Sequence, residues 1–282
     1  MDIRIEAFNM RIEKKFTKKF NDCLKENVDL SKYSWFNLGG NAEFFFKARD
    51  KIQLLEFLKE AKKKNLKTTI VGAGSNTLFR DNGVKGAVIK LGKNFSYTKL
   101  IDENIIEAGA GTLDRKVANF AMSNNLGNFE CLSCIPVSIG GAIIMKSGCY
   151  DDDISKVLLS IKAIDKKNLS EIEIKKEDIK FLYRGTDLSD DLIILSAKFK
   201  GTIEKKNNIE MKQLTLIKKK KDSQPSQIKT CGSTFKNISK DKKAWMLIKK
   251  AGCESLKEGD AMISQKHCNF FVNNGNAKSS DI

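Results

Sequence analysis

The chain has 282 residues, of which 41% are hydrophobic and 30% are charged, and its formal net charge is +16. This composition is typical of a globular protein with one large domain or two to three small ones. No segment approaches the roughly 18 apolar residues of a membrane-spanning helix, and the polar N-terminus is unlike a secretory signal. The charge comes from scattered lysines rather than from a cluster of basic and aromatic residues, and this scatter favours a compositional bias over nucleic-acid binding. A basic surface would still attract a phosphate-bearing substrate.

Alternating strand and helix patterns predict a first α/β unit that ends near Gly92. Its expected elements, in chain order, are a lysine-rich helical lead-in over residues 1–33, a glycine turn and strand over 34–46, a helix over 51–64, a buried β-branched strand over 68–71 and a strand over 86–91.

The strand over 68–71 leads directly into Gly-Ala-Gly-Ser-Asn-Thr at residues 72–77. Gly72 and Gly74 can adopt positive φ and leave room for a ligand. Successive backbone N–H groups in such a turn point into one concavity, which suits a phosphate or pyrophosphate. The segment lacks the Lys-Ser/Thr of a P-loop and the third glycine of the Rossmann fingerprint. A tight turn that binds no ligand is the alternative.

The second unit is expected to contain a strand over 105–111, a helix over 113–124 and strands over 157–164 and 192–199. Between them, residues 131–150 are small, apolar and rich in glycine. This composition predicts either tight packing or contact with a large, flat ligand.

The seven cysteines form an odd number and, without a signal peptide, indicate reduced thiols in a cytoplasm. Cys131 and Cys134 have the spacing of half a zinc site. His267 is the only histidine, and no second Cys-x-x-Cys follows. Because zinc needs further ligands, we expect no metal site.

A lysine-rich break over residues 201–229 predicts a boundary before a third unit. That unit contains Cys-Gly-Ser-Thr-Phe-Lys-Asn at 231–237, an expected helix over 242–251 and an expected strand over 268–273.

Six segments stand in one order along the chain: S-W-F-N-L-G-G-N-A-E, G-A-G-S-N-T-L, I-P-V-S-I-G-G-A, F-L-Y-R-G-T, C-G-S-T-F-K-N and A-M-I-S-Q-K-H-C-N-F. This series resembles the UDP-N-acetylenolpyruvoylglucosamine reductase family, in its shorter form, from about Ser31 onward. The resemblance implies an α+β fold, with a two-part FAD-binding module of the PCMH or vanillyl-alcohol-oxidase type and a C-terminal α/β substrate domain. The corresponding domains are 1–92 and 93–200 for the two FAD-binding parts and 201–282 for the substrate domain.

The resemblance further implies an NADPH-dependent UDP-N-acetylmuramate dehydrogenase, a cytoplasmic, monomeric flavoprotein of peptidoglycan synthesis that acts on a UDP-sugar. No partner among nucleic acids or membranes is expected. FAD is expected to be noncovalent, since no histidine lies in the flavin segments. In this family's chemistry, hydride passes from reduced flavin to the enolpyruvyl group and a proton follows.

The family's functional residues can be placed on the matching positions of this sequence. Arg184 matches the arginine that stabilises the charge developing beside the substrate carboxylate, and Ser233 matches the proton donor. The predicted cofactor-binding residues are Gly72, Ala73, Gly74, Ser75, Asn76, Thr77, Leu78, Ile135, Pro136, Ser138, Gly140, Gly141, Ser147 and Gly148, and the predicted substrate-binding residues are Tyr183, Lys236 and Asn237.

Three departures from the family pattern leave two alternatives open. The family's catalytic glutamate is expected after residues 273–277 and has no counterpart before Ile282. Cys134 and Val137 stand where glycines are usual and Lys146 where asparagine is usual, and a lysine precedes Gln-Pro at 224–225 where arginine is common. The alternatives are a truncated or decayed relative that binds FAD or nucleotide without full turnover, and another flavin oxidoreductase of the same fold.

Overall fold

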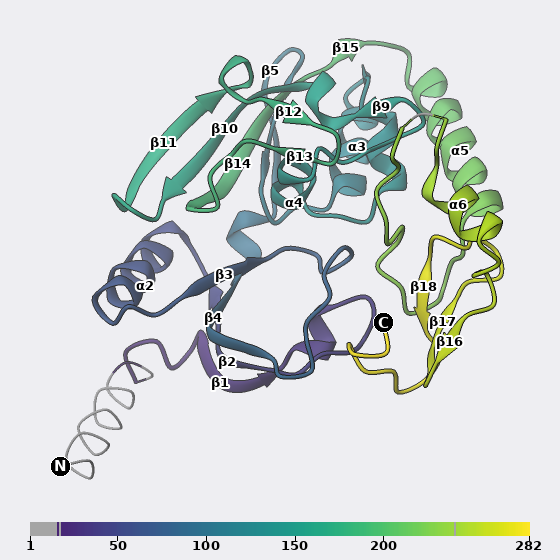
Figure 1. Cartoon of the computed structure of the whole chain (residues 1–282). Coiled ribbons are helices and arrows are strands. Elements are labelled where there is room, and N and C mark those ends of the chain that lie inside the picture. The colour runs from purple at the N-terminus through teal and green to yellow at the C-terminus, as the bar shows by residue number, and fades with distance from the viewer. Residues whose placement is uncertain (1–15, 17, 240) are drawn as a thin grey trace.

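The computed structural model describes residue 16, residues 18–239 and residues 241–282 (Figure 1). An N-terminal unit, purple to blue, lies opposite a teal to green unit, and the yellow C-terminal unit lies beside both. Residues 1–15 and 17 of the expected helical lead-in lie outside the described residues.

The first unit is built on a four-stranded sheet in the order β1-β2-β4-β3. Strands β2 and β3 run parallel to β4, whereas β1 runs antiparallel to β2. The expected helix up to residue 33 is wrong over β1, because this segment pairs with β2, and such tertiary pairing overrides local preference. The strands are β1 (Leu24–Asp29), β2 (Asn41–Ala48), β3 (Thr68–Val71) and β4 (Val84–Leu91).

Helix α2 (Lys51–Lys63) connects β2 to β3 and buries one face against the sheet. The Asp50 side chain begins the helix by accepting a hydrogen bond from the backbone N–H of Gln53 at 2.9 Å. The ring of Phe57 stacks on that of Phe46 from β2, with centroids 3.8 Å apart. Two short 3-10 helices complete the unit, η1 (Leu30–Tyr33) and η2 (Lys93–Phe95).

The second unit contains a five-stranded antiparallel sheet in the order β11-β10-β14-β6-β5. Its core joins the sheet to two helices and a 3-10 helix, as the fully buried Ile106, Val117 and Ile139 indicate. The strands of the sheet are β5 (Thr98–Asp102), β6 (Ile105–Gly109), β10 (Leu158–Asp165), β11 (Ser170–Lys175) and β14 (Leu192–Lys200). The other elements are α3 (Asp114–Ser123), β7 (Leu126–Gly127), η3 (Glu130–Cys134), α4 (Ile139–Ile144), β8 (Gly148–Cys149), β9 (Asp152–Asp153), η4 (Ile154–Lys156), η5 (Lys176–Asp178), β12 (Phe181–Leu182), β13 (Gly185–Thr186) and β15 (Thr202–Ile203).

Most of the expected lysine-rich break is helix α5 (Lys206–Ser223), which packs against α3 and η3. Ile209 is fully buried there, and the side-chain amide of Gln213 donates to the carbonyl oxygen of Ala118 at 3.2 Å. The sequence analysis expects no helix here, because so few residues of this helix are buried that the sequence carries little periodic signal. The domain boundary itself stays a prediction.

The third unit is a three-stranded sheet, β16 (Lys257–Glu258), β17 (Ala261–Ile263) and β18 (Phe271–Asn273), with helix α6 (Ala244–Lys250). It docks on the first unit. The Asp81 carboxylate accepts hydrogen bonds from the backbone N–H groups of Ser279 and Ser280, at 2.7 and 3.0 Å. The Asn273 side chain donates to the carbonyl oxygen of Phe36 at 2.9 Å.

Candidate functional site

A cavity of about 1220 Å³ lies between the first and second units. One wall is β3 with the loop of residues 72–77, and the other is formed around Ala110 and Ser138. Strand β3 was expected to be buried, which is wrong for Thr69 and Ile70. Both residues are exposed to the cavity, because β3 is the edge strand of its sheet.

The loop of residues 72–77 turns carbonyl oxygens toward the protein. The carbonyl oxygen of Gly72 accepts a hydrogen bond from Nζ of Lys90 at 2.7 Å, and that of Gly74 accepts one from the N–H of Trp35 at 3.0 Å. Within the described residues, none of the backbone N–H groups of residues 73–77 donates to a protein acceptor. The loop therefore presents a row of free donors beside the cavity, as an anion nest requires.

Neither glycine of this loop leaves room for a side chain. Gly74 has a φ of +73°, and a Cβ there would lie 1.9 Å from the carbonyl oxygen of Tyr33. A Cβ on Gly72 would lie 2.5 Å from the hydroxyl oxygen of Ser138 on the opposite wall. The two walls therefore lie close together at Gly72 and Ser138, and a side chain at residue 72 would collide with the opposite wall.

The opposite wall is held on the second sheet by its backbone. The N–H of Ile139 donates to the carbonyl oxygen of Thr112, and the N–H of Gly140 donates to that of Ala110, each at 2.9 Å. Val137 lines the cavity without a positive φ, so the β-branched side chain causes no backbone strain there.

The predicted cofactor-binding residues fall into two groups. Those that line the cavity are Gly72, Ala73, Gly74, Ser75, Asn76, Thr77, Ser138, Gly140 and Gly141. The others do not line it in the described structure, and their role stays a prediction: Leu78, Ile135, Pro136, Ser147 and Gly148.

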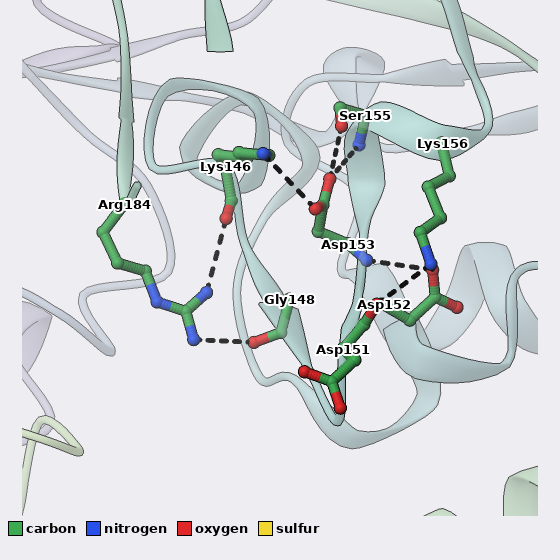
Figure 2. Close-up of polar contacts among 8 residues, drawn as sticks. All are labelled: Lys146, Gly148, Asp151, Asp152, Asp153, Ser155, Lys156 and Arg184. Atoms are coloured by element: carbon green, nitrogen blue, oxygen red, sulfur yellow. Dashed lines mark hydrogen bonds and ion pairs between the residues drawn. The ribbon is translucent and has the colours of Figure 1, made fainter. Parts of the chain in front are cut away.

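Arg184 lies in the tight turn between β12 and β13 and reaches the segment that follows α4 (Figure 2). Its Nη2 donates to the carbonyl oxygen of Gly148 at 2.9 Å and its Nη1 to that of Lys146 at 3.3 Å. Its φ of +56° lies in the left-handed region, which costs a non-glycine residue about 1–2 kcal/mol. No ion pair of the described residues includes Arg184, so its charge is available to an anion.

Lys146, which stands where the family has asparagine, also has a positive φ, of +41°. Asparagine tolerates that conformation better than lysine does. The Lys146 ammonium pairs with Asp153 at 3.6 Å, and Asp153 also accepts from the backbone N–H of Ser155 at 2.9 Å. Figure 2 shows this carboxylate turned toward Lys146, which fixes the segment that Arg184 holds from the other side.

Ser233 lies in an exposed loop of the third unit, where its backbone forms an isolated bridge with Phe270. The buried side chain of Asn269 holds this loop. Its Oδ1 accepts from the N–H of Phe235 and its Nδ2 donates to the carbonyl oxygen of Phe235, both at 3.0 Å. Lys236 is exposed, and Oδ1 of Asn237 accepts from the N–H of Ala244 at the start of α6, at 3.0 Å.

The structure does not join the two predicted catalytic residues. No hydrogen bond or ion pair within the described ranges connects Arg184 with Ser233 or Lys236. The third unit does contact the loop of residues 72–77, called the nest loop below, on the side of its carbonyl oxygens. The thiol of Cys231 lies 3.3 Å from the carbonyl oxygen of Thr77 and 3.6 Å from that of Gly74.

The thiols of Cys131, Cys134 and Cys149 lie close to one another in the second unit. The Cys149 thiol donates to the carbonyl oxygen of Cys131 at 3.6 Å. Interaction with the Cys149 side chain lowers the pKa of Cys134, while burial raises the pKa of Cys131. Among the described residues, no group of three or more His, Cys, Asp or Glu side chains is placed to hold a metal ion.

Two family profiles match the chain. The profile of an FAD binding domain matches residues 42–168, and that of the C-terminal domain of UDP-N-acetylenolpyruvoylglucosamine reductase matches residues 224–282. The UDP-N-acetylenolpyruvoylglucosamine reductase of Pelagibacter ubique is 46% identical over 271 residues, which are 95% of this chain and 89% of the relative. The chain belongs to the UDP-N-acetylenolpyruvoylglucosamine reductase family. The reductase of Rickettsia felis is 40% identical over 258 residues, covering 92% of this chain and 86% of the relative.

Comparison with solved structures supports the same family assignment. The UDP-N-acetylenolpyruvylglucosamine reductase of Thermus caldophilus superposes with a TM-score of 0.80 at 29% identity, covering 90% of each chain. A p-cresol methylhydroxylase, 13% identical with a TM-score of 0.51 over 70% of this chain and 44% of its own, shows the fold alone. The predicted family, FAD-binding fold, FAD cofactor and enzyme class are confirmed.

The residues of the cavity fit FAD. The free N–H groups of residues 73–77 suit a pyrophosphate, and the small residues at Gly72, Gly140 and Gly141 leave the walls open to a flat ring system. No helix of the described residues is long and apolar enough to span a bilayer.

Two contributors to the site were not predicted from the sequence. Lys90 holds the nest loop, and its only sequence signal is a lysine within the apolar run that forms β4. Asn269 holds the Ser233 loop from within a quoted family segment, but nothing local distinguishes it from a surface asparagine.

Proposed function

We propose that the protein reduces the enolpyruvyl ether of UDP-N-acetylglucosamine to UDP-N-acetylmuramate with NADPH, as a step of peptidoglycan precursor synthesis. The observation that carries this proposal is the row of free N–H groups at residues 73–77 beside a large cavity between the first and second units. Family membership and the FAD-binding profile support the same reaction class.

Bound FAD supplies the hydride, which NADPH replenishes. The task of Arg184 is to bind the carboxylate of the enolpyruvyl group, where negative charge grows as the hydride arrives. A guanidinium can pair with a carboxylate through two parallel hydrogen bonds. Because two main-chain carbonyl oxygens hold Arg184 in place, it needs no reorganisation as the charge develops, and such preorganised stabilisation is usually the largest catalytic term.

Ser233 would deliver the proton to the carbon that carries the developing charge. A serine is a weak acid, but a strongly basic carbanion can take its proton when the hydroxyl is well placed. Asn269 fixes the backbone next to Ser233. Since Ser233 is exposed in the third unit, we infer that the substrate itself brings the third unit and the Arg184 turn into one site, with Tyr183, Lys236 and Asn237 as substrate contacts.

We further propose a division into residues 1–92, 93–200 and 201–282, a monomer, a cytoplasmic location, and FAD held without a covalent bond. The docking of the third unit through Asp81 and Asn273 supports a monomer that assembles its site within one chain.

Anaerobic mixing experiments test the proposed function. Protein that carries FAD should lose its visible flavin absorbance with NADPH and regain it when the UDP-linked enolpyruvyl sugar is added. Absorbance that NADPH removes and the sugar does not restore would favour another flavin oxidoreductase of the same fold.

A further inference from the structure

Lys90 lies near the end of β4, at the centre of the first sheet. It is paired in register with Val71 of β3 on one side and with Lys47 of β2 on the other. Both lysines line the cavity between the units. The Lys90 ammonium donates one hydrogen bond, to the carbonyl oxygen of Gly72 at 2.7 Å. Its side chain therefore ends beside the cavity, at the residue that precedes the N–H groups of residues 73–77.

In the part of the chain that the structure describes, no carboxylate pairs with the charge of Lys90. No ion pair within the described residues includes Lys90 or Lys47. Burial lowers the pKa of Lys90, and the neighbouring charge of Lys47 lowers it further. Removing an ammonium from water without a counter-ion is unfavourable. Nearby lysines of the same cavity are compensated differently, since Lys166 and Lys167 both pair with Asp191.

Apart from the Gly72 carbonyl oxygen and the Tyr33 ring, whose centroid lies 5.9 Å from Nζ, no group offsets this half-buried charge within the described residues. A cation without a carboxylate partner, beside unoccupied N–H donors, is suited to an anion of more than one charge. An ammonium has three donors, and only one of them is used by Gly72. We propose that Lys90 is a binding residue for the pyrophosphate bridge of FAD and at the same time the positioning residue that aims the nest loop. This inference rests on the assignment of the cavity to FAD.

Flavin binding to the full-length apoprotein tests this role, measured by quenching of flavin fluorescence. Riboflavin has the same ring as FAD but no phosphate. Lys90→Gln keeps a donor for the Gly72 carbonyl and removes the charge, Lys90→Arg keeps both, and Lys90→Met removes both. Lys93→Gln is the matched control, because Lys93 lines the same cavity but is exposed.

We expect Lys90→Gln to weaken FAD binding by about 10–100-fold, the usual effect of losing one charged hydrogen-bond partner. Riboflavin binding should change by less than about threefold, Lys90→Arg should recover most of the FAD affinity, and Lys93→Gln should behave as wild type. If Lys90→Gln does not fold, Lys90→Met carries the test, because an apolar side chain replaces the buried charge without a new polar group.

Equal losses for FAD and riboflavin, or a Lys93→Gln loss as large as that of Lys90→Gln, would overturn the inference. A wild-type apoprotein that binds neither flavin would instead overturn the assignment of the cavity to FAD.

Discussion

Nη2 of Arg184 lies 2.9 Å from the carbonyl oxygen of Gly148 and donates a hydrogen bond to it. The arginine proposed to bind the substrate carboxylate is thus also attached to the glycine-rich segment that follows α4. A residue with a positive φ in a two-residue turn, held by two carbonyl oxygens, has few alternative positions. Backbone strain of this kind is often concentrated at functional sites.

Arg184→Lys should leave reduction of the flavin by NADPH intact and lower transfer to the enolpyruvyl sugar by about 10²–10³-fold, the usual effect of losing one preorganised donor. Lysine keeps the charge, but its compact ammonium lacks the planar fork that pairs with a carboxylate through two parallel hydrogen bonds. Stopped-flow measurement of the two half-reactions separates these effects. Substrate reduction that stays within about twofold of wild type in Arg184→Ala would exclude the proposed role.

Gly72→Ala should weaken FAD binding, because the added Cβ would lie 2.5 Å from the hydroxyl oxygen of Ser138. The next atom of Ser138 is 3.9 Å away, an ordinary contact. The double variant Gly72→Ala/Ser138→Ala should therefore recover much of the affinity that Gly72→Ala loses. Titration with FAD checks this coupling, and losses that simply add would show that the two walls are not in contact there.

Ser233→Ala should remove the proton donor and lower turnover by about 10²–10⁴-fold, while FAD content and flavin reduction by NADPH stay unchanged. Ser226→Ala, which alters an exposed hydroxyl of the same unit, is the control. Steady-state turnover with the enolpyruvyl sugar is the measurement, and a loss below about threefold would assign proton delivery to another group.

Asp114→Asn should stabilise the protein near neutral pH. Both carboxylate oxygens of Asp114 are buried and find no hydrogen-bond partner among the described residues, and burial raises the pKa of Asp114 well above the usual 3.8. Because the pKa of Asp114 is higher in the folded than in the unfolded protein, its contribution to the free energy of unfolding is most favourable below the unfolded-state pKa. That contribution is lost as the pH rises, because the buried carboxyl must then ionise or hold a proton that the unfolded chain releases. The midpoint of thermal unfolding should exceed that of wild type by about 2 °C or more at neutral pH.

That difference should shrink as the pH falls through 3.8, because Asp114 is protonated in both states only below that value. Asp22→Asn, at an exposed acid, is the control and should show no such trend. A gap that widens on acidification would mean that Asp114 is ionised and stabilised in the folded protein.

Much of the fold could be predicted from local sequence patterns. The bounds of β3 and the position of the loop at residues 72–77 were predictable, because a β-branched run followed by glycines is a local signal. Contacts between distant segments were not. Lys90 reaches Gly72 across neighbouring strands, Arg184 reaches Gly148 from another hairpin, and α5 shows little apolar periodicity although Ile209 is fully buried. Such contacts depend on tertiary packing rather than on local propensity.

The proposed function requires that the cavity hold FAD noncovalently and that the bound flavin pass its electrons to the enolpyruvyl sugar. Single-turnover absorbance of the purified, full-length chain measures both. The protein should be yellow, release all of its flavin as FAD on acid precipitation, lose its visible absorbance with NADPH and regain it on addition of the UDP-linked enolpyruvyl sugar without oxygen. A colourless protein that takes up no added FAD would exclude the cofactor assignment, and colour that stays with the precipitated polypeptide would exclude noncovalent binding.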